Sequence, residues 1–373
     1  MFFYYITGFL SLKLKGIIFD AVSIKIVVGM KNFYFFNDSL LIKNLFTKNL
    51  FAFLILIVFL LSHYACNTTE LIININSDQD TTSHNFTFKT WTFGEHSSSV
   101  LYDVAIIDEN NIWVVGEIYM NDSLGNHDPI AYNAINWDGS EWHLKRIYFP
   151  TVCGSASLTP YPAKAIFAFN DGQIWVSSSG DKMAILENRI QIDKFCLPEN
   201  VSMSINKIWG CNSNDLYIVG NKGNIAHFTG PTTGWQKIES TTDINLRDVW
   251  GSPDGSVVWS VGFDDFYGTV FLRNTINGFE KVLEITDPEM PHPPNQITHI
   301  FKSLWTDKSD TIYLGAVGRI YAAPYNTNGD ADEKIWWDYQ NQQGYPPETN
   351  VIRGNSDHDI FVAGYLNFIL LLS

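Results

Sequence analysis

A unit of about 42 residues recurs along most of this sequence, and its clearest copy runs from Lys207 to Trp235. In this copy an apolar pair ends in Trp209 and is followed by the polar turn CNSND, by the run Leu216 to Gly220 and by the run Asn224 to Phe228. A Gly-Trp pair then begins a fourth segment. Short runs rich in Val, Ile, Trp and Tyr, separated by Asn, Asp, Gly and Ser, are typical of strands and turns. The unit therefore predicts four short strands.

Five further copies place the unit six times along the chain. An aromatic residue followed closely by glycine marks the second strand of each copy, at Trp113, Trp175, Tyr217, Trp259, Tyr313 and Phe361. The first strand recurs as YDVAI, KAIFAF, KIWG, RDVWG, SLWT and NVIRG. The marker aromatics lie 42 to 62 residues apart, and such a period with four strands per unit is typical of a β-propeller. The alternative is two stacked β-sandwiches whose strands resemble one another by accident.

The last copy ends after three strands, and this predicts how the ring closes. Its third strand, residues 367–373 (NFILLLS), would expose an apolar edge, which soluble proteins avoid. Residues 86–93, FTFKTWTF, alternate apolar and polar side chains and can supply the missing strand. We therefore expect residues 84–373 to form an all-β, six-bladed β-propeller closed by an N-terminal strand in the last blade, with seven blades as the alternative.

Before the repeats the chain carries an apolar segment with the features of an export signal. Residues 50–61 are twelve apolar positions without a charge, preceded by Lys43 and Lys48. Twelve residues are too few for a membrane span of about 20 and match the apolar core of a secretory signal. We expect residues 43–65 to be a signal peptide and residues 66–83 a polar tether.

Residues 1–42 lack the repeat pattern. Because an extension of this length before a signal peptide is unusual, we interpret it as the product of a translation start placed too early, although Met30 is the only later methionine before the signal. A second membrane-active segment within residues 1–29 is the competing interpretation.

The four cysteines occur in different contexts. Cys66 follows the apolar segment directly, where a bacterial lipoprotein would carry its lipidated cysteine, but His63 stands where such signals usually have Leu. An ordinary signal peptide or an uncleaved anchor is therefore the alternative to lipidation. Cys153 and Cys196 flank the second copy, and in an exported chain they can form a disulfide; two buried thiols are the alternative.

The charge of the chain restricts its partners. The net charge is −15, and removal of residues 1–65 would make it about −19. A nucleic-acid partner needs clustered Lys and Arg to neutralise phosphates, so we expect none. We expect a monomer that contacts a membrane only through its N-terminal lipid and binds a glycan or another envelope protein.

The long connections between strands all fall on one face of the expected propeller. They are residues 117–130, 148–160, 286–297 and 340–349. Variable loops on a rigid scaffold are where recognition is usually built. The aromatic and acidic side chains of this face that could stack on or hydrogen-bond to a ligand are Tyr119, Asp122, His127, Asp128, Asp265, Tyr267, His292 and Tyr345.

Catalytic and metal-binding patterns are weak in this sequence. A glycosidase needs two carboxylates about 5 to 10 Å apart, and the acids on the expected face could provide them, but no pattern selects a pair. The histidines lack metal-ligand spacing, so we predict no metal centre and assign no catalytic residue. Oxygen ligands alternate at Asn326, Asn328, Asp330 and Asp332 as in calcium loops. However, Gly329 is misplaced for such a loop, so we favour a solvated turn and predict no cofactor.

The repeated Trp-Gly pairs, Trp209-Gly210 and Trp250-Gly251, with Val219-Gly220 and with Asp138-Gly139 before Trp142, resemble a known group of propellers. These are the repeats of bacterial exported lipoproteins that carry glucosyltransferase-like or photosystem assembly-factor-like labels. The resemblance covers residues 84–373 and implies a propeller of six to eight blades at the cell envelope. It carries over no catalytic residue.

Together these features favour a binding or scaffold protein over an enzyme. We expect an exported chain, anchored by lipid at the bacterial outer membrane or cell surface, with a periplasmic or secreted location as the alternative. It would recognise its glycan or envelope protein through the face with the long loops. The competing function is a carbohydrate-active hydrolase or lyase, which a propeller fold does not exclude.

Overall fold

A computed structural model describes residues 5–8, 22–27, 87–95, 98–264, 268–285, 300–306, 310–316, 319–329, 332–336, 349–356, 359–364 and 369–372. The chain divides into two units, residues 30–80 and the remainder, and all six repeats lie in the remainder. The described residues contain strands, turns and one 3-10 turn, Glu199–Val201, but no α-helix. No described helix is long and apolar enough to cross a membrane.

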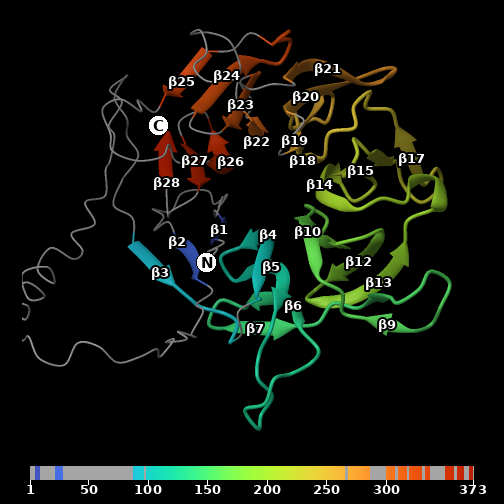
Figure 1. The fold of residues 1–373 in the computed structure, drawn as a ribbon, viewed down its shortest axis with the longest axis vertical. Helices are drawn as coiled ribbons and strands as arrows, with labels where there is room; N and C mark the ends of the chain where they lie inside the picture. The colour runs from blue at the N-terminus through green and yellow to red at the C-terminus, as the bar shows by residue number, and fades with distance from the viewer. Residues whose placement is uncertain are drawn as a thin grey trace, which may run out of the picture. The chain divides into compact units, whose positions relative to one another are not determined.

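Six antiparallel sheets follow the six sequence repeats in chain order (Figure 1), and we number them one to six. The first four have four strands each: β4 (Val100–Asp108), β5 (Asn111–Ile118), β6 (Tyr132–Trp137) and β7 (Trp142–Lys145); β10 (Ala163–Ala168), β11 (Gln173–Ser178), β12 (Lys182–Glu187) and β13 (Ile190–Cys196); β14 (Ile205–Asn212), β15 (Asp215–Gly220), β16 (Ile225–Phe228) and β17 (Trp235–Ile238); β18 (Leu246–Gly251), β19 (Val258–Asp264), β20 (Gly268–Thr275) and β21 (Gly278–Ile285).

The fifth sheet has four strands and the sixth has three among the described residues. They are β22 (Phe301–Thr306), β23 (Thr311–Ala316), β24 (Arg319–Pro324) and β25 (Asp332–Trp336), then β26 (Thr349–Ser356), β27 (Asp359–Gly364) and β28 (Ile369–Leu372). The repeat therefore folds as the sequence predicts, into successive antiparallel sheets whose strands pair in chain order.

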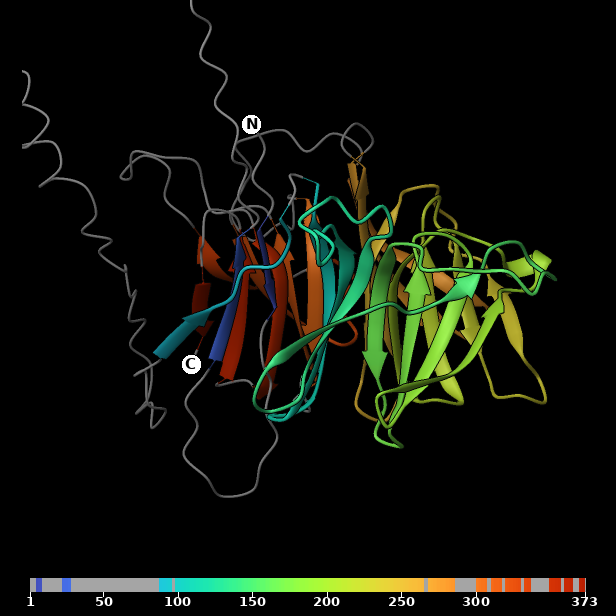
Figure 2. The ribbon, with the colours of Figure 1, turned by 90° about the horizontal axis from the view of Figure 1, so that it is seen from below.

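Neighbouring sheets pack through their first strands. β4 contacts β10, β10 contacts β14, and the series continues through β18 and β22 to β26. Figure 2 shows these sheets from the side, with their strands running between two edges of the unit. The apolar cores lie between consecutive sheets: one joins the second and third, another the third and fourth. Inner strands are thus covered on both faces.

This packing explains the sequence pattern of the second strands. In β15 the four residues from Leu216 to Val219 are all buried, because a strand covered on both faces favours a continuous apolar run. The outer strand β13 has no buried residue instead, and its Ile190 and Ile192 are exposed. Distance from the centre of the unit therefore sets the pattern of each strand.

The recurring Trp-Gly pair has a packing role. A Cβ on Gly251 of β18 would lie 2.1 Å from Cη2 of Trp209 of the preceding sheet. A Cβ on Gly354 would likewise lie 2.9 Å from Cη2 of Trp305. The missing side chain of one sheet thus makes room for the indole ring of the sheet before it.

The closure of the ring differs from the prediction. We expected residues 86–93 to pair with residues 367–373, but β3 (Thr87–Thr90) pairs in parallel with β2 (Val22–Val27). β2 pairs in turn with β1 (Tyr5–Gly8), and the three form a separate sheet. Among the described residues, β28 pairs only with β27. The expected clasp is therefore not the pairing that the structure contains.

The aromatic part of the expected clasp packs on the first sheet instead. The ring centroid of Trp91 lies 5.7 Å from that of Trp137 and 5.6 Å from that of Trp142. Phe93 also contacts Trp142, at 5.7 Å between centroids. Trp91 was expected in the last sheet because it lies within residues 86–93. The physical reason for the difference is that Trp91 packs on the two tryptophans that flank the turn between β6 and β7.

Cys153 and Cys196 form a disulfide with a Cα separation of 5.8 Å. Cys153 lies in the connection between the first two sheets, which contains the short strands β8 (Phe149–Pro150) and β9 (Leu158–Thr159). Cys196 ends β13. The bond therefore ties this connection to the outer strand of the second sheet. Cys211 is a free, half-buried thiol, and Cys66 lies outside the described residues.

Candidate functional site

Each first strand contains one extra residue near its start. The pairing with the second strand skips one residue between Leu101 and Asp103, and it does the same at the equivalent place in the other five sheets. We call the skipped residues the bulge position: Tyr102, Lys164, Asn206, Arg247, Lys302 and Asn350. Bulges are frequent beside functional sites because they redirect a side chain and interrupt pairing.

Four of the six residues that follow the bulges have polar side chains, and these four belong to a buried polar network. We call all six residues the network position: Asp103, Ala165, Lys207, Asp248, Ser303 and Val351. Asp103 accepts a hydrogen bond from the backbone N–H of Ile166 at 3.0 Å, and Asp248 accepts one from that of Leu304 at 3.1 Å. Each carboxylate thus binds a backbone donor of a neighbouring first strand, which joins the sheets.

Two ion pairs complete this network. Lys207 Nζ lies 2.5 Å from Asp103 Oδ1. Arg353 of β26 donates from Nη1 and Nη2 to the two carboxylate oxygens of Asp248, each at 3.0 Å. Burial alone would raise the pKa of Asp248, but the charges of Arg353 and Lys207 outweigh it and hold that pKa below its ordinary value. The network position is therefore electrically balanced.

At the bulge position, two positive charges have no partner of opposite charge in the described part of the chain. Lys164 and Arg247 form no ion pair among the described residues. Lys164 Nζ lies 3.9 Å from the centroid of the Tyr102 ring, and Arg247 Cζ lies 5.2 Å from that of Phe263. Lys302 Nζ approaches the same Phe263 ring at 4.2 Å. Cations from three sheets therefore gather on aromatic rings at one end of the inner strands.

The pKa of Lys164 reflects this arrangement. It is lowered first by burial and second by the positive charge of Arg247, while Asp103 acts in the opposite direction. The Nε atom of Arg247 is buried and has no hydrogen-bond partner in the described part of the chain. An orphaned buried donor beside a second cation favours an anion at this place.

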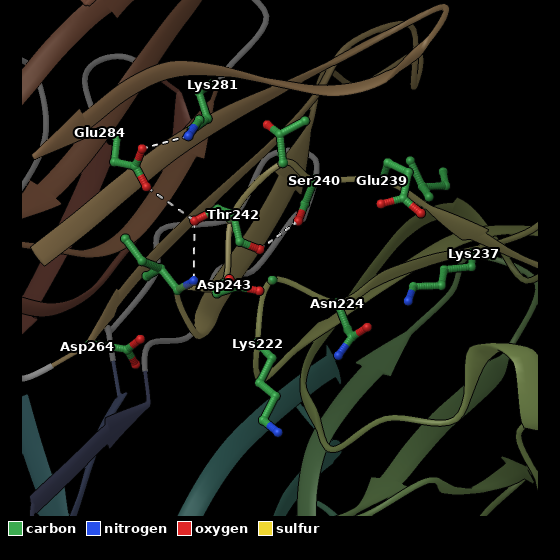
Figure 3. A pocket seen from close by; sticks show the side chains of 14 residues that line it. Lys222, Asn224, Lys237, Glu239, Ser240, Thr242, Asp243, Asp264, Lys281 and Glu284 are labelled. Carbon is green, nitrogen blue, oxygen red and sulfur yellow. Dashed lines mark hydrogen bonds and ion pairs between the residues drawn. The ribbon is translucent and has the colours of Figure 1, made fainter. Parts of the chain in front are cut away.

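A polar cavity of about 840 Å³ opens at the same end of the third and fourth sheets. Its lining comes from the turn between β15 and β16, the connection between β17 and β18, the end of β19, and β21 (Figure 3). Asp264, which follows Phe263, belongs to this lining and accepts a hydrogen bond from the side chain of Asn245. Phe263, which contacts Arg247 and Lys302, is therefore next in sequence to a residue that lines the cavity.

The cavity lining contains both fixed and unpaired charges. Lys281 Nζ lies 2.6 Å from Glu284, which also accepts a hydrogen bond from Thr242 (Figure 3). The side chains of Lys222, Lys237 and Glu239 have no ion pair among the described residues. Such groups can donate to and accept from a polar ligand without first breaking an internal bond.

Two residues of the lining have an unusual backbone conformation. Lys222 has a φ of 57° and Thr241 a φ of 57°. A β-branched residue such as Thr rarely adopts positive φ, and residues held there cost roughly 1 to 3 kcal/mol and cluster at functional sites. Two hydrogen bonds to the residues just before β18 hold the turn at Lys222: Lys222 N donates to Asn245 Oδ1, and Gly223 N donates to Ile244 O.

Half of the predicted ligand-binding residues can be placed, and the structure assigns several of them local roles. The rings of Tyr119 and His127 stack with centroids 5.9 Å apart. Asp122 accepts hydrogen bonds from the backbone of its own loop at Leu124 and Asn126. Asp128 pairs with Arg146 at 2.5 Å, and hydrogen bonds from the Ile130 backbone and from Arg146 lower its pKa.

Tyr119 also donates to Glu117 at 2.6 Å, which raises the pKa of Tyr119 to about 12. The other predicted residues, Asp265, Tyr267, His292 and Tyr345, lie outside the described residues, as does Asp330 of the segment that was compared with calcium loops. The structure thus brings Tyr119 and His127 together, while Asp122 and Asp128 organise the loop that carries them.

Sequence reasoning missed the cations of the bulge position. A signal was present, because Lys164, Arg247 and Lys302 occupy the same place in the recurring first-strand motif, where the surrounding residues are mostly apolar. The lining of the cavity carried no such signal, since its residues come from strands and turns separated by up to about 60 positions.

No protein-family model and no curated protein matches the chain. Solved structures of propeller-like proteins resemble it at low identity. YCF48 bound to a D1 peptide has a TM-score of 0.51 and 12% identity, with 74% of this chain and 78% of that chain covered.

Two further structures match only part of longer chains. The extracellular domain of the putative hybrid two-component system BT4673 from B. thetaiotaomicron has a TM-score of 0.50 and 15% identity, covering 75% of this chain and 33% of that one. PorZ, a surface component of the type-IX secretion system of Porphyromonas gingivalis, has a TM-score of 0.52 and 12% identity, with 75% of this chain and 41% of that chain covered. Identities this low show the fold alone. With its consecutive antiparallel sheets, the chain therefore has a β-propeller type of fold.

Proposed function

We propose that this chain is a binding or scaffold protein of the bacterial cell envelope. It recognises a glycan or another envelope protein through the edge of the sheets that carries the bulge position and the polar cavity. The long connections that the sequence assigns to this edge contribute further contacts.

The cavity is the observation that carries this proposal. Its volume of about 840 Å³ falls in the range of ligand pockets, roughly 300 to 1,000 Å³. Its lining is rich in Lys, Asp, Glu, Ser and Thr, which suits a hydroxyl-rich or peptide ligand more than an apolar one. Three of these polar side chains, Lys222, Lys237 and Glu239, have no ion pair to break within the described part of the chain.

The similar structures support the same class of role. One was solved with a bound peptide, and another is named as a surface component of a secretion system. By analogy we propose a macromolecular partner for this chain, and an exported location. Lipid attachment at Cys66 after cleavage of residues 43–65 would provide the anchor.

Processing and blade number are linked in this proposal. Cleavage before Cys66 would remove β1 and β2, which form a sheet with β3. The processed chain would then keep the six repeat sheets, and we propose six blades for it. The intact mass of the protein from a bacterial membrane fraction tests this: a chain that retains residues 1–65 would contradict both the cleavage and the six-bladed form.

The binding role can be tested with purified protein on immobilised bacterial glycans and envelope proteins. We expect a partner whose affinity falls at least about tenfold, or roughly 1.4 kcal/mol, in Lys237→Ala combined with Glu239→Ala. Lys194→Ala on the exposed outer strand β13 is the matched control. Equal binding by the double variant and the control would refute recognition through the cavity.

The same preparations test the enzyme alternative. Asp264 and Asp243 both line the cavity, so a hydrolase would use acids of this lining. Cleavage of a bound glycan that disappears in Asp264→Asn or Asp243→Asn would replace the binding role with a catalytic one.

A further inference from the structure

We propose that Lys164 and Arg247 of the bulge position form a subsite for a single carboxylate group. This inference rests on the proposed binding role and deepens it by naming the chemistry that the centre of the recognition edge would take.

The first support is the charge balance along the inner strands. Of the cations there, Lys207 and Arg353 are matched to Asp103 and Asp248. Asp103 also accepts from Val104 N and Ile166 N. Asp248 accepts from Val249 N, Ser303 Oγ and Leu304 N. These carboxylates are fully used, so they leave the charges of Lys164 and Arg247 without a bonded counter-ion among the described residues.

The second support is that the two cations occupy the same register position in the first strands of two different sheets, so both lie at one end of the inner strands. The positive charge of Arg247 acts on the Lys164 ammonium. Holding two like charges near each other in a partly buried place costs free energy. An anionic ligand would recover that free energy.

The third support is geometric. The bulge leaves Arg247 with a buried Nε that has no acceptor in the described part of the chain. A guanidinium presents its donors in a planar fork that fits the two oxygens of a carboxylate, and an ammonium can add a third hydrogen bond. The half-buried rings of Tyr102 and Phe263 contact the two cations from one side.

The surroundings favour one carboxylate over a polyanion. The charge of Asp103 acts on Lys164, and the whole chain is acidic. A polyphosphate or polyuronate would be repelled along most of its length. A single carboxylate at the end of an otherwise neutral chain would place its one charge between Lys164 and Arg247.

The test compares two pairs of small probes that differ only in this group. N-acetylalanine is compared with N-acetylalanine amide, and glucuronic acid with glucose, by saturation-transfer difference NMR titration of the full protein. We expect at least one acid to bind about tenfold or more tightly than its neutral partner. Preference for the first acid indicates a peptide terminus, and preference for the second indicates an acidic sugar. Equal binding within both pairs overturns the proposal.

Variants locate the subsite. Lys164→Met and Arg247→Met should each abolish most of the preference for the acid, whereas Lys164→Arg should keep it and the exposed control Lys194→Met should not change it. An unchanged preference in Lys164→Met and Arg247→Met would overturn the proposal. The comparison of acid with neutral probe in the unaltered protein decides the matter even if a variant fails to fold. If the protein binds the acid probes but no immobilised glycan or envelope protein, the proposed function is wrong and the carboxylate subsite is retained.

Discussion

Two neighbouring positions on the inner strands differ in whether their charged side chains have partners of opposite charge. At the network position Asp248 is 3% exposed and its charge is matched by Arg353. One residue earlier, at the bulge position, Arg247 and Lys164 lack any such partner in the described part of the chain. The same scaffold therefore contains one layer whose charges hold the sheets together and one layer whose charges do not.

The difference shows how a repeat protein can separate stability from recognition. A buried ion pair that also bonds backbone donors is costly to break, so we expect substitutions that break the pairs at Asp103 and Asp248 to destabilise the fold. The bulge position carries no such bonds at Lys164 and Arg247, and its residues can vary with the ligand. Substitutions at both positions test this separation.

Arg353→Met should have the largest effect. It leaves the buried carboxylate of Asp248 without its bidentate partner, and we expect a loss of about 3 to 5 kcal/mol in the free energy of unfolding at neutral pH. Urea denaturation followed by tryptophan fluorescence measures this. A loss below about 1 kcal/mol would show that the network position does not hold the sheets together.

The pH dependence of Arg353→Met provides a second check. In the unaltered protein the pKa of Asp248 is held below its ordinary value. Its charge therefore stabilises the fold above about pH 4, and this contribution is lost as the pH falls through the lowered pKa. In the variant, burial raises that pKa. The deficit relative to the unaltered protein should then shrink from about pH 7 to about pH 4.

Lys207→Met should have a smaller effect of the same sign. Asp103 would lose its ion pair but keep the backbone donors of Val104 and Ile166. We expect a loss of about 2 to 3 kcal/mol in the same denaturation experiment. A loss larger than that of Arg353→Met would contradict the ranking, which rests on the deeper burial of Asp248.

Asn206→Ala tests a member of the bulge position that does have partners. Its side-chain nitrogen donates to Leu246 O and to Asn221 Oδ1, both at 2.8 Å. We expect a loss of about 1 to 2 kcal/mol with no change in preference for the carboxylate probes. An altered preference would extend the proposed subsite to the third sheet.

Lys164→Met should have the smallest effect on stability and the opposite sign. Because the pKa of Lys164 is lowered by burial and by Arg247, its charge opposes folding at neutral pH, and we expect a gain of up to about 1 kcal/mol. The gain should fade as the pH rises through the lowered pKa towards about 10.4, where lysine is neutral in both states. Clear destabilisation at neutral pH would assign Lys164 a structural role.

The strands could be predicted from the sequence because their signals are local. The marker aromatics, the glycines and the polar turns lie within a few residues of one another, and Tyr217 and Trp259 each mark a second strand in the structure. The residues expected to contact a ligand stay a prediction, and in the structure Asp122 and Asp128 bind their own loop and Arg146.

The closure and the site depended on contacts that no local pattern reveals. Trp91 lies in a segment whose apolar and polar residues alternate as in a strand, but packing against Trp137 and Trp142 decides its place. Charge matching is equally non-local: Lys207 lies 104 residues from Asp103, and Arg353 lies 105 residues from Asp248.

Residues close together in the chain were enough to establish the number of repeat units, the strands within each and the recurring Trp-Gly pairs. Contacts between sheets, in contrast, decide which cations have an acidic side chain beside them. Lys164, Lys207, Arg247 and Arg353 are alike as cations on inner strands, and they differ only in what another sheet places beside them. Recognition, as we propose it, rests on that difference.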